Sequence, residues 1–377
     1  IKNTLSSFDR TGLFLCCLAA VLAQALDAPM NLSPLRDHPP QDVEQLEDQL
    51  STPTAEVIET LARCDSDIVL LGVGGKMGPT MARMARRAMD QAGVQRRVIG
   101  VSRFREPGVR EKLSGWGVET LSCDLVQRDQ VQALPDAGHV IHLAGFKFGA
   151  SQSPEQLWAT NCQVPLLVSQ RYQDTPIVAF STGSLYGMVN VSSGGSLEED
   201  PPRPDGEYSM AAVCRENIFR YYSQALQIPM VILRLNYATE LRYGILVDLA
   251  SQVVADEPVD ISMTCFNVIW LSDANAMTLR AIEHGSSPAR VLNITGPDTL
   301  RVPDVCHQMG NQLGKSVTLA GEESDMAFLS NSSAAYPLLG HPLIDANTMA
   351  RWTVDWVSQG RENLGKPTKF QVRDGSY

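Results

Sequence analysis

Short apolar runs alternate with amphipathic segments along most of the chain. Runs rich in Val, Ile and Leu and bounded by turn residues predict buried strands at 68–72, 97–102, 118–123, 139–143, 177–181 and 230–235. Apolar positions at helical spacing predict helices over 53–62, 77–89, 154–172 and 207–227. The alternation indicates an α/β fold, a doubly wound parallel sheet with helices on both faces, whose ligand lies at the carboxyl ends of the strands.

This pattern divides the chain into three parts. Residues 1–52 form an N-terminal segment, residues 53–236 hold the predicted sheet, and residues 237–377 form mainly a smaller lobe. A Ser-, Gly- and Pro-rich stretch at 188–206 is predicted to be a long loop over the site, because long loops are often functional.

The N-terminal segment has two interpretations. An apolar stretch at 13–26 follows Lys2 and Arg10 and contains Ala-Gln-Ala, which is typical of a secretory signal and too short for a confident membrane span. Because the chain begins with Ile1, we favour the alternative that this is upstream translated sequence with Met30 as the natural start. Residues 31–52 are polar and contain prolines, and they predict a loosely ordered arm.

Composition narrows the class of protein. Hydrophobic residues make up 44% and charged residues 19% of the 377 residues, which predicts a folded core. The net charge of −11 opposes attraction to nucleic acid or anionic membranes, so we expect neither as a partner. The cysteines and histidines show no spacing typical of metal ligands, and we expect no metal and a cytoplasmic location with reduced thiols.

The first predicted strand leads into a glycine-rich turn, Gly72-Val-Gly74-Gly75-Lys-Met77-Gly78. Glycines at this spacing allow a tight turn and close approach of a pyrophosphate, and the following helix presents free N–H groups to phosphates. The position of the turn between a strand and a helix favours a nucleotide site over a merely structural turn.

The second predicted strand ends in Ser102-Arg103, with no carboxylate at the strand end. An acidic residue at this position is typical of NAD sites, whereas arginine accommodates the 2′-phosphate of NADP. We therefore predict NADP as the preferred cofactor, with NAD as the alternative, in which case the arginine is an ordinary surface residue.

Further motifs follow in order: His142-Leu143-Ala144-Gly145, Ser181-Thr182-Gly-Ser-Leu-Tyr186-Gly, and Leu233-Arg-Leu-Asn236. With the glycine turn they resemble the extended short-chain dehydrogenase/reductase family, which includes NAD-dependent sugar epimerases and dehydratases. The resemblance extends from about 67 to at least 315. It implies an NAD(P)-binding Rossmann domain over 53–236, and a small-molecule substrate bound mainly by 237–377. It is also compatible with a homodimer formed through the helices at 154–172 and 207–227.

The resemblance implies roles for individual residues. Thr182 would bind the reacting oxygen, and Tyr208 would be the acid/base. Tyr186 and Asn236 would either touch substrate or belong to the core. The expected cofactor contacts are Gly72, Gly74, Gly75, Met77, Gly78, Ser102, Arg103, Asp124, Leu125, Leu143, Ala144, Gly145, Asn161 and Tyr208.

The sequence departs from the family in the helix that carries Tyr208. The family pattern is Y-x-x-x-K, and Ala212 stands at the lysine position. The family's lysine holds the nicotinamide ribose and stabilises phenolate, since a free phenol has a pKa near 10. Arg215 lies on the same helical face but at a difficult reach, and Lys147 follows a strand end. Our hypothesis is that Lys147 completes a proton-transfer site with Thr182 and Tyr208.

The expected function is that of an NAD(P)-dependent oxidoreductase or epimerase acting on a sugar-like or other polar carbonyl or alcohol. The alternative is a catalytically impaired, redox-responsive NADP-binding module. The presence of Thr182 and Tyr208 favours the enzyme, whereas Ala212 favours the module.

Overall fold

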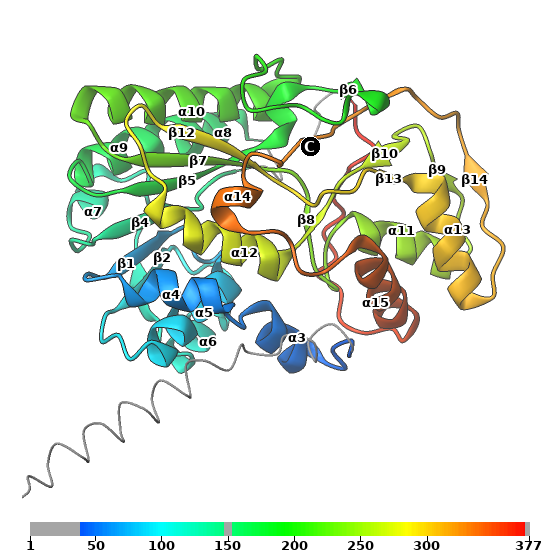
Figure 1. Ribbon diagram of the computed structural model, residues 1–377, viewed down its shortest axis with the longest axis horizontal. Helices are drawn as coiled ribbons and strands as arrows, with labels where there is room; N and C mark the ends of the chain where they lie inside the picture. Colours follow the sequence, from blue (N-terminus) through cyan, green and yellow to red (C-terminus); the bar gives the residue numbers. More distant parts are fainter. Residues whose placement is uncertain (1–37, 147–152, 374–377) are drawn as a thin grey trace, which may run out of the picture. The chain divides into compact units, whose positions relative to one another are not determined.

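The computed structural model describes residues 38–146 and 153–373, and the described residues from Pro39 onward form one compact unit. Its main sheet has seven parallel strands in the order β12-β7-β5-β4-β1-β2-β3 (Figure 1). Their bounds are β1 (Ile68–Leu71), β2 (Val98–Ser102), β3 (Glu119–Ser122), β4 (His139–His142), β5 (Ile177–Thr182), β7 (Met230–Leu235) and β12 (Arg290–Ile294). The predicted doubly wound α/β fold is confirmed.

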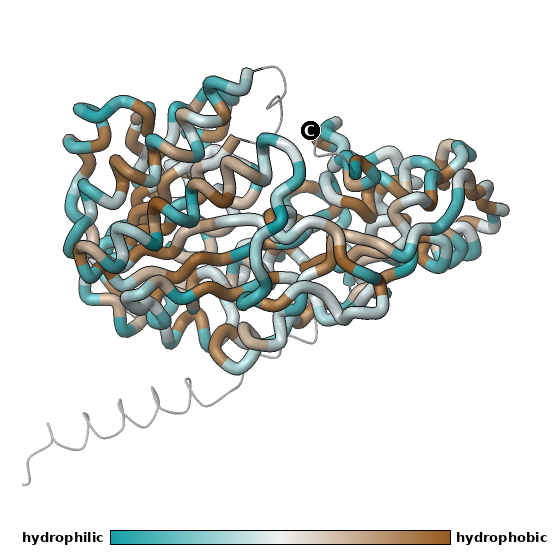
Figure 2. Tube along the Cα trace, turned by 90° about the horizontal axis from the view of Figure 1, so that it is seen from above, coloured by the Kyte–Doolittle hydropathy of each residue, from teal (hydrophilic) through white to brown (hydrophobic). Residues whose placement is uncertain are grey.

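Helices cover both faces of this sheet. Ile68 and Leu70 of β1 join one apolar core, whereas Val69 and Leu71 join the other, because successive side chains of a strand point to opposite faces. This is why β1 is a continuous apolar run, and Figure 2 shows brown, apolar stretches along the strands. The first face carries α4 (Ala55–Ala62), α5 (Gly78–Gln91), α6 (Val109–Gly115) and α12 (Leu271–Arg280), and the second carries α7 (Arg128–Gln132), α9 (Val164–Arg171) and α10 (Gly206–Leu226).

A second lobe has its own apolar core, built mainly from α11 (Ile245–Val254), α13 (Val302–Leu313) and α15 (Ala346–Ser358). Two-residue strands pair around it: β9 (Val259–Asp260) with β14 (Leu319–Ala320), β10 (Cys265–Phe266) with β13 (Leu300–Arg301), and β8 (Ala238–Thr239) with β11 (Ile269–Trp270). The remaining short elements are α14 (Tyr336–Leu339), η3 (Gly183–Tyr186), η4 (Val191–Ser193) and η5 (Ala281–Glu283).

The prediction of a loosely ordered arm over 31–52 is wrong for the second half of that range, which contains the helix α3 (Val43–Leu50). The side chain of Asp42 caps its N-terminus, and Leu46 and Leu50 are fully buried in the core of the second lobe. The polar residues are the outer face of an amphipathic helix, and its two leucines were too few to identify it. The next helix begins at Ala55 rather than Pro53, because Thr54 is its N-cap.

The segment 188–206 is fastened to the second lobe rather than forming a free loop. Its strand β6 (Val189–Asn190) pairs antiparallel with β15 (Met326–Ala327). Glu198 accepts a hydrogen bond from the backbone N–H of Asn293, and its own carbonyl accepts one from Arg234. These contacts tie the segment to β12 and β7.

The predicted helix over 154–172 consists of three pieces. A π-helical turn, η2 (Ala159–Gln163), separates α8 (Pro154–Trp158) from α9, and Asn161 lies in its middle. Such wide turns occur frequently at functional sites.

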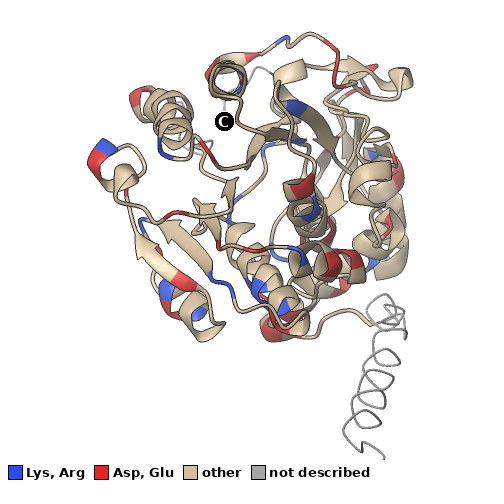
Figure 3. Cartoon of the chain, turned by 60° about the vertical axis from the view of Figure 1, so that its left-hand side comes forward, with Lys and Arg blue, Asp and Glu red and all other residues tan. Residues whose placement is uncertain are grey.

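Acidic and basic positions are interspersed over the described part of the chain (Figure 3). Within it, no helix is both long and apolar enough to cross a membrane. The same residues contain no group of three His, Cys, Asp or Glu side chains suited to a metal ion.

Candidate active site

A glycine turn joins β1 to α5 at the carboxyl edge of the sheet. Gly72 has a φ of +90°, a conformation that strains residues with side chains. A Cβ at Gly72 would lie 2.7 Å from the backbone nitrogen of Ala144, and one at Gly78 would overlap the carbonyl oxygen of Val73. The turn therefore packs backbone against backbone and presents the N-terminus of α5, where a phosphate is stabilised.

A cleft of about 260 Å³ lies against this turn. The predicted cofactor residues that line it are Gly72, Gly74, Gly75, Ser102, Arg103, Asp124, Leu125, Leu143, Ala144 and Gly145. Met77 and Tyr208 line a neighbouring pocket, Gly78 begins α5, and Asn161 is fully buried behind the cleft. The glycines leave the floor of the cleft without side chains, and the N-terminus of α5 adjoins it. Both features fit a bound dinucleotide.

The far end of the cleft is formed by residues that follow β2 and β3. Arg103 is exposed there, and Ser102 Oγ accepts a hydrogen bond from the backbone N–H of Phe104 at 3.4 Å. Glu106 also lines this end. The cleft therefore brings a basic and an acidic side chain near the position expected for the adenosine ribose.

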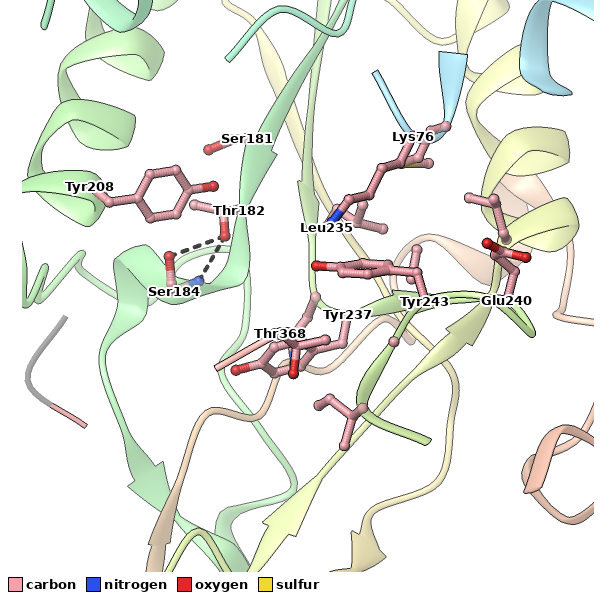
Figure 4. Close-up of a pocket in the computed structure, with 16 residues that line it drawn as sticks. Lys76, Ser181, Thr182, Ser184, Tyr208, Leu235, Tyr237, Glu240, Tyr243 and Thr368 are labelled. Carbon is pink, nitrogen blue, oxygen red and sulfur yellow. Dashed lines mark hydrogen bonds between the residues drawn. The ribbon is translucent and has the colours of Figure 1, made fainter. Parts of the chain in front are cut away.

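A second pocket, of about 220 Å³, lies at the carboxyl end of β5 (Figure 4). Thr182 ends this strand, Ser184 belongs to η3, and Tyr208 lies in the first turn of α10. The hydroxyls of Thr182 and Ser184 are 3.1 Å apart, and the backbone N–H of Ser184 donates to Thr182 Oγ1 at 3.2 Å. The threonine hydroxyl is thus held in place while the tyrosine hydroxyl points toward it across the pocket.

Lys76 brings a cation into this pocket from the glycine turn. Its Nζ is buried and lies 3.1 Å from the ring centroid of Tyr243, so the ammonium rests on the aromatic face. Burial, with Asp248 and Tyr208 nearby, raises the pKa of the Tyr243 hydroxyl. The ends of Lys76, Tyr208 and Tyr243 all point toward the middle of the pocket (Figure 4).

Sequence reasoning missed several residues that line the pocket, among them Lys76, Glu240, Tyr243 and Thr368. A lysine inside the glycine turn was a usable signal, since its backbone position is fixed by the turn. The other three come from segments without a motif. Glu240 accepts hydrogen bonds from Arg242, and burial raises the pKa of its carboxyl.

The two predicted substrate contacts lie in different surroundings. Asn236 lines the pocket, and its side-chain amide donates to Asn267 Oδ1 at 2.6 Å. Tyr186 is 2% exposed, and its hydroxyl donates to Asn293 and accepts from Arg234. The structure therefore places Asn236 at the pocket and Tyr186 in a satisfied hydrogen-bond network in the core.

The helix α10 shows what surrounds the missing lysine position. Ala212 is fully buried. Arg215 is 4% exposed, and its Nη1 donates to Asn161 Oδ1 at 2.7 Å. Arg215 therefore reaches the back of the cleft at Asn161 and Gly145, and whether it acts on Tyr208 stays a prediction. Lys147 lies outside the described residues, and its role stays a prediction.

Comparison with known proteins agrees with this geometry. Residues 68–238 match the NAD dependent epimerase/dehydratase family. The match confirms the resemblance to this family over that part of the chain. A search of curated proteins found no match.

Three solved structures of similar fold are sugar-nucleotide enzymes. UDP-glucuronic acid 4-epimerase from Bacillus cereus, solved with UDP-glucuronic acid and NAD, is 20% identical, with a TM-score of 0.64 over 78% of this chain and 99% of that one. UDP-glucose 4-epimerase from Thermotoga maritima is 18% identical, with a TM-score of 0.65 over 78% and 99%. dTDP-glucose 4,6-dehydratase from Bacillus anthracis, solved with NAD, is 17% identical, with a TM-score of 0.63 over 78% and 96%.

Proposed function

We propose that the protein is an NAD(P)-dependent epimerase, dehydratase or oxidoreductase that acts on a hydroxyl-bearing carbon of a sugar-like substrate. The observation that carries the proposal is the meeting of Thr182 and Tyr208 in one pocket beside the glycine-floored cleft. When bound in the cleft, the cofactor would accept or return a hydride. The UDP- and dTDP-sugar enzymes of similar fold support a nucleotide sugar as the first substrate class to test.

Two side chains would handle the oxygen of the substrate. Thr182, held by Ser184, would donate a hydrogen bond to it, and Tyr208 would take or return its proton. Lys76 would add positive charge near an oxygen that becomes anionic during the reaction. Lys147 remains a second candidate for this charge.

A substrate panel tests the proposal. The full chain would be incubated with nucleotide sugars, sugars and sugar acids plus NADP or NAD, with reduced nicotinamide read by absorbance and products separated by chromatography. Tyr208→Phe should lower turnover at least a hundredfold, because it removes the hydroxyl that would move the substrate's proton. Tyr221→Phe, whose residue is 65% exposed, is the matched control. Two results would contradict the proposal: cofactor binding without turnover of any substrate in the panel, or turnover that Tyr208→Phe leaves unchanged.

The cofactor preference is part of the proposal. Arg103 at the open end of the cleft supports NADP over NAD, because a guanidinium pairs well with a 2′-phosphate. Calorimetric titration of the full chain with NADPH and NADH measures this, and tighter binding of NADH would contradict it. Nicotinamide nucleotides are cytoplasmic metabolites, and the free thiols of the described cysteines are in keeping with that compartment.

A homodimer is the proposed assembly. Trp158, Met210 and Tyr221 are 36%, 50% and 65% exposed and line an apolar groove over α8 and α10. A second copy would bury these side chains, as exposed apolar patches mark association sites. Light scattering should give a dimer for the wild type and a monomer for Met210→Asp, and a monomeric wild type would refute the assembly.

A further inference from the structure

Two arginines near the site are enclosed, and they differ in how their charge is balanced. Arg234 is 1% exposed and donates two hydrogen bonds, of 2.9 and 2.8 Å, to the carboxylate of Glu216. Arg215 is 4% exposed and forms no ion pair with an acidic side chain of the described residues. Its Nε is buried and donates to no acceptor among them.

The guanidinium of Arg215 lies directly behind the cleft. A Cβ added to Gly145 would be 2.9 Å from Arg215 Nη1, and Gly145 lines the cleft. Asn161, which accepts from Arg215, donates in turn to the carbonyl of Phe146 at 3.3 Å. The pair thus holds the backbone that follows β4.

Sheet order shows which end of the cleft this is. β4 lies between β1 and β5, whereas β2 and β3 lie on the other side of β1. Arg215 is also on α10, the helix that carries Tyr208. Its charge is therefore at the reaction end of the cleft, and Ser102 and Arg103 are at the opposite end.

Among the described residues, no acidic side chain compensates this charge. His142, fully buried nearby, stays neutral, because burial and then Arg215 lower its pKa to about 3. The sequence Lys-Phe-Gly-Ala-Ser-Gln at 147–152 contains no carboxylate. A buried cation without an anion is costly, and an anionic ligand in the adjoining cleft would offset that cost.

We propose that Arg215, held by Asn161, supplies the positive charge that this family places four residues after the tyrosine, and that it positions the nicotinamide end of the cofactor. Arg215 acts as a positioning residue, through Asn161 and the Gly145–Phe146 backbone. The π-helical turn brings Asn161 to the guanidinium, and Ala212 is the small residue that this arrangement accommodates. The inference rests on the proposed cofactor of this site.

The test is calorimetric titration of the full chain with NADPH and with adenosine 2′,5′-bisphosphate, which fills only the adenosine end. Arg215→Met keeps much of the side-chain volume and removes the charge. It should weaken NADPH at least tenfold and the bisphosphate less than twofold. Arg215→Lys should stay within about threefold of the wild type for NADPH.

A relocated lysine separates this role from a merely structural one. In Arg215→Ala with Ala212→Lys, the lysine is restored one turn earlier, and NADPH affinity should recover at least fivefold over Arg215→Ala alone. Arg234→Met, which breaks the buried pair with Glu216, is the matched control and should change the ratio of the two affinities less than twofold.

Each result has a distinct meaning. Equal weakening of both ligands in Arg215→Met, or unchanged NADPH affinity in a variant with a cooperative thermal transition, would overturn the role of Arg215. The role would also be overturned if NADPH bound as weakly to Arg215→Lys as to Arg215→Met and no more tightly to the double variant than to Arg215→Ala. A wild-type protein that binds neither nicotinamide nucleotide would instead overturn the proposed function.

Discussion

The cofactor cleft and the reaction pocket are neighbours built in opposite ways. The cleft is formed by backbone that follows successive strands, with glycines where atoms come closest. The pocket is formed by side chains from segments as far apart as Lys76, Tyr208 and Thr368. A site defined by backbone depends on a few glycines, whereas a site defined by side chains depends on the networks that hold each of them.

The largest expected effect concerns the network beside the pocket. Glu216→Gln leaves Arg234 buried without its counter-charge, and we expect a loss of about 3–5 kcal/mol in the free energy of unfolding. Denaturant unfolding measures it. Glu283→Gln, which removes an exposed pair with Arg63, should cost less than about 1 kcal/mol. Similar losses in both variants would show that the pocket does not depend on buried pairs.

The next effect concerns the backbone of the cleft. In Gly72→Ala the added Cβ would meet Ala144 in an unfavourable φ region, and we expect NADPH affinity to fall about a hundredfold, or about 2.7 kcal/mol. Calorimetry measures the loss. Gly115→Ala, whose Cβ would have no neighbour within 4 Å, should bind like the wild type. Wild-type affinity in Gly72→Ala would refute a backbone-defined cleft.

Acid should lower the free energy of unfolding through His142, which is buried behind the cleft. Its pKa is about 3 when folded, against an ordinary 6.5, so below pH 6.5 the unfolded chain binds a proton that the folded chain does not. Stability contributed by neutral His142 is lost as pH falls, by about 1.6 kcal/mol from pH 6.5 to pH 5. His142→Phe should remove this part of the pH dependence in denaturant unfolding. His307→Phe, at an exposed position, is the control and should keep it. Equal slopes of unfolding free energy against pH for the wild type and both variants would contradict the assignment to His142.

The smallest effect concerns Arg103, the charged side chain that we propose selects NADP over NAD. Arg103→Ala should weaken NADPH about tenfold, or about 1.4 kcal/mol, and leave NADH within twofold. Arg128→Ala, which removes an exposed arginine bonded to Gln170, is the control for net charge. Parallel losses for both nucleotides in Arg103→Ala would remove the 2′-phosphate assignment.

The same contrast explains what the sequence could predict. The sheet and cleft were predictable because strand runs and glycine spacing are local, and the cleft residues follow strands at their carboxyl ends. Tyr243 and Thr368 were not, because long-range packing of the second lobe brings them to the pocket. The helix α3 was missed for a related reason, since Leu46 and Leu50 find their partners in that distant lobe.

Arg215 illustrates most clearly what the sequence alone could not predict. Sequence spacing places it on the face of Tyr208, but it gives no indication of a wide turn in another helix that would bring Asn161 to meet it. The interpretation of Tyr186 as a substrate contact was similarly open until Asn293 and Arg234 were seen to satisfy its hydroxyl.

The π-helical turn also constrains how this protein can vary in length. An α-helix advances about 100° per residue, and the wide turn accommodates one extra residue within η2. Deleting one residue between Ala159 and Gln163 would restore a regular helix and rotate one flank against the other by about a quarter of a revolution. Asn161 could then no longer meet Arg215 while α9 kept its apolar side on the sheet. Single-residue deletions here should therefore be far less tolerated than substitutions at the same positions.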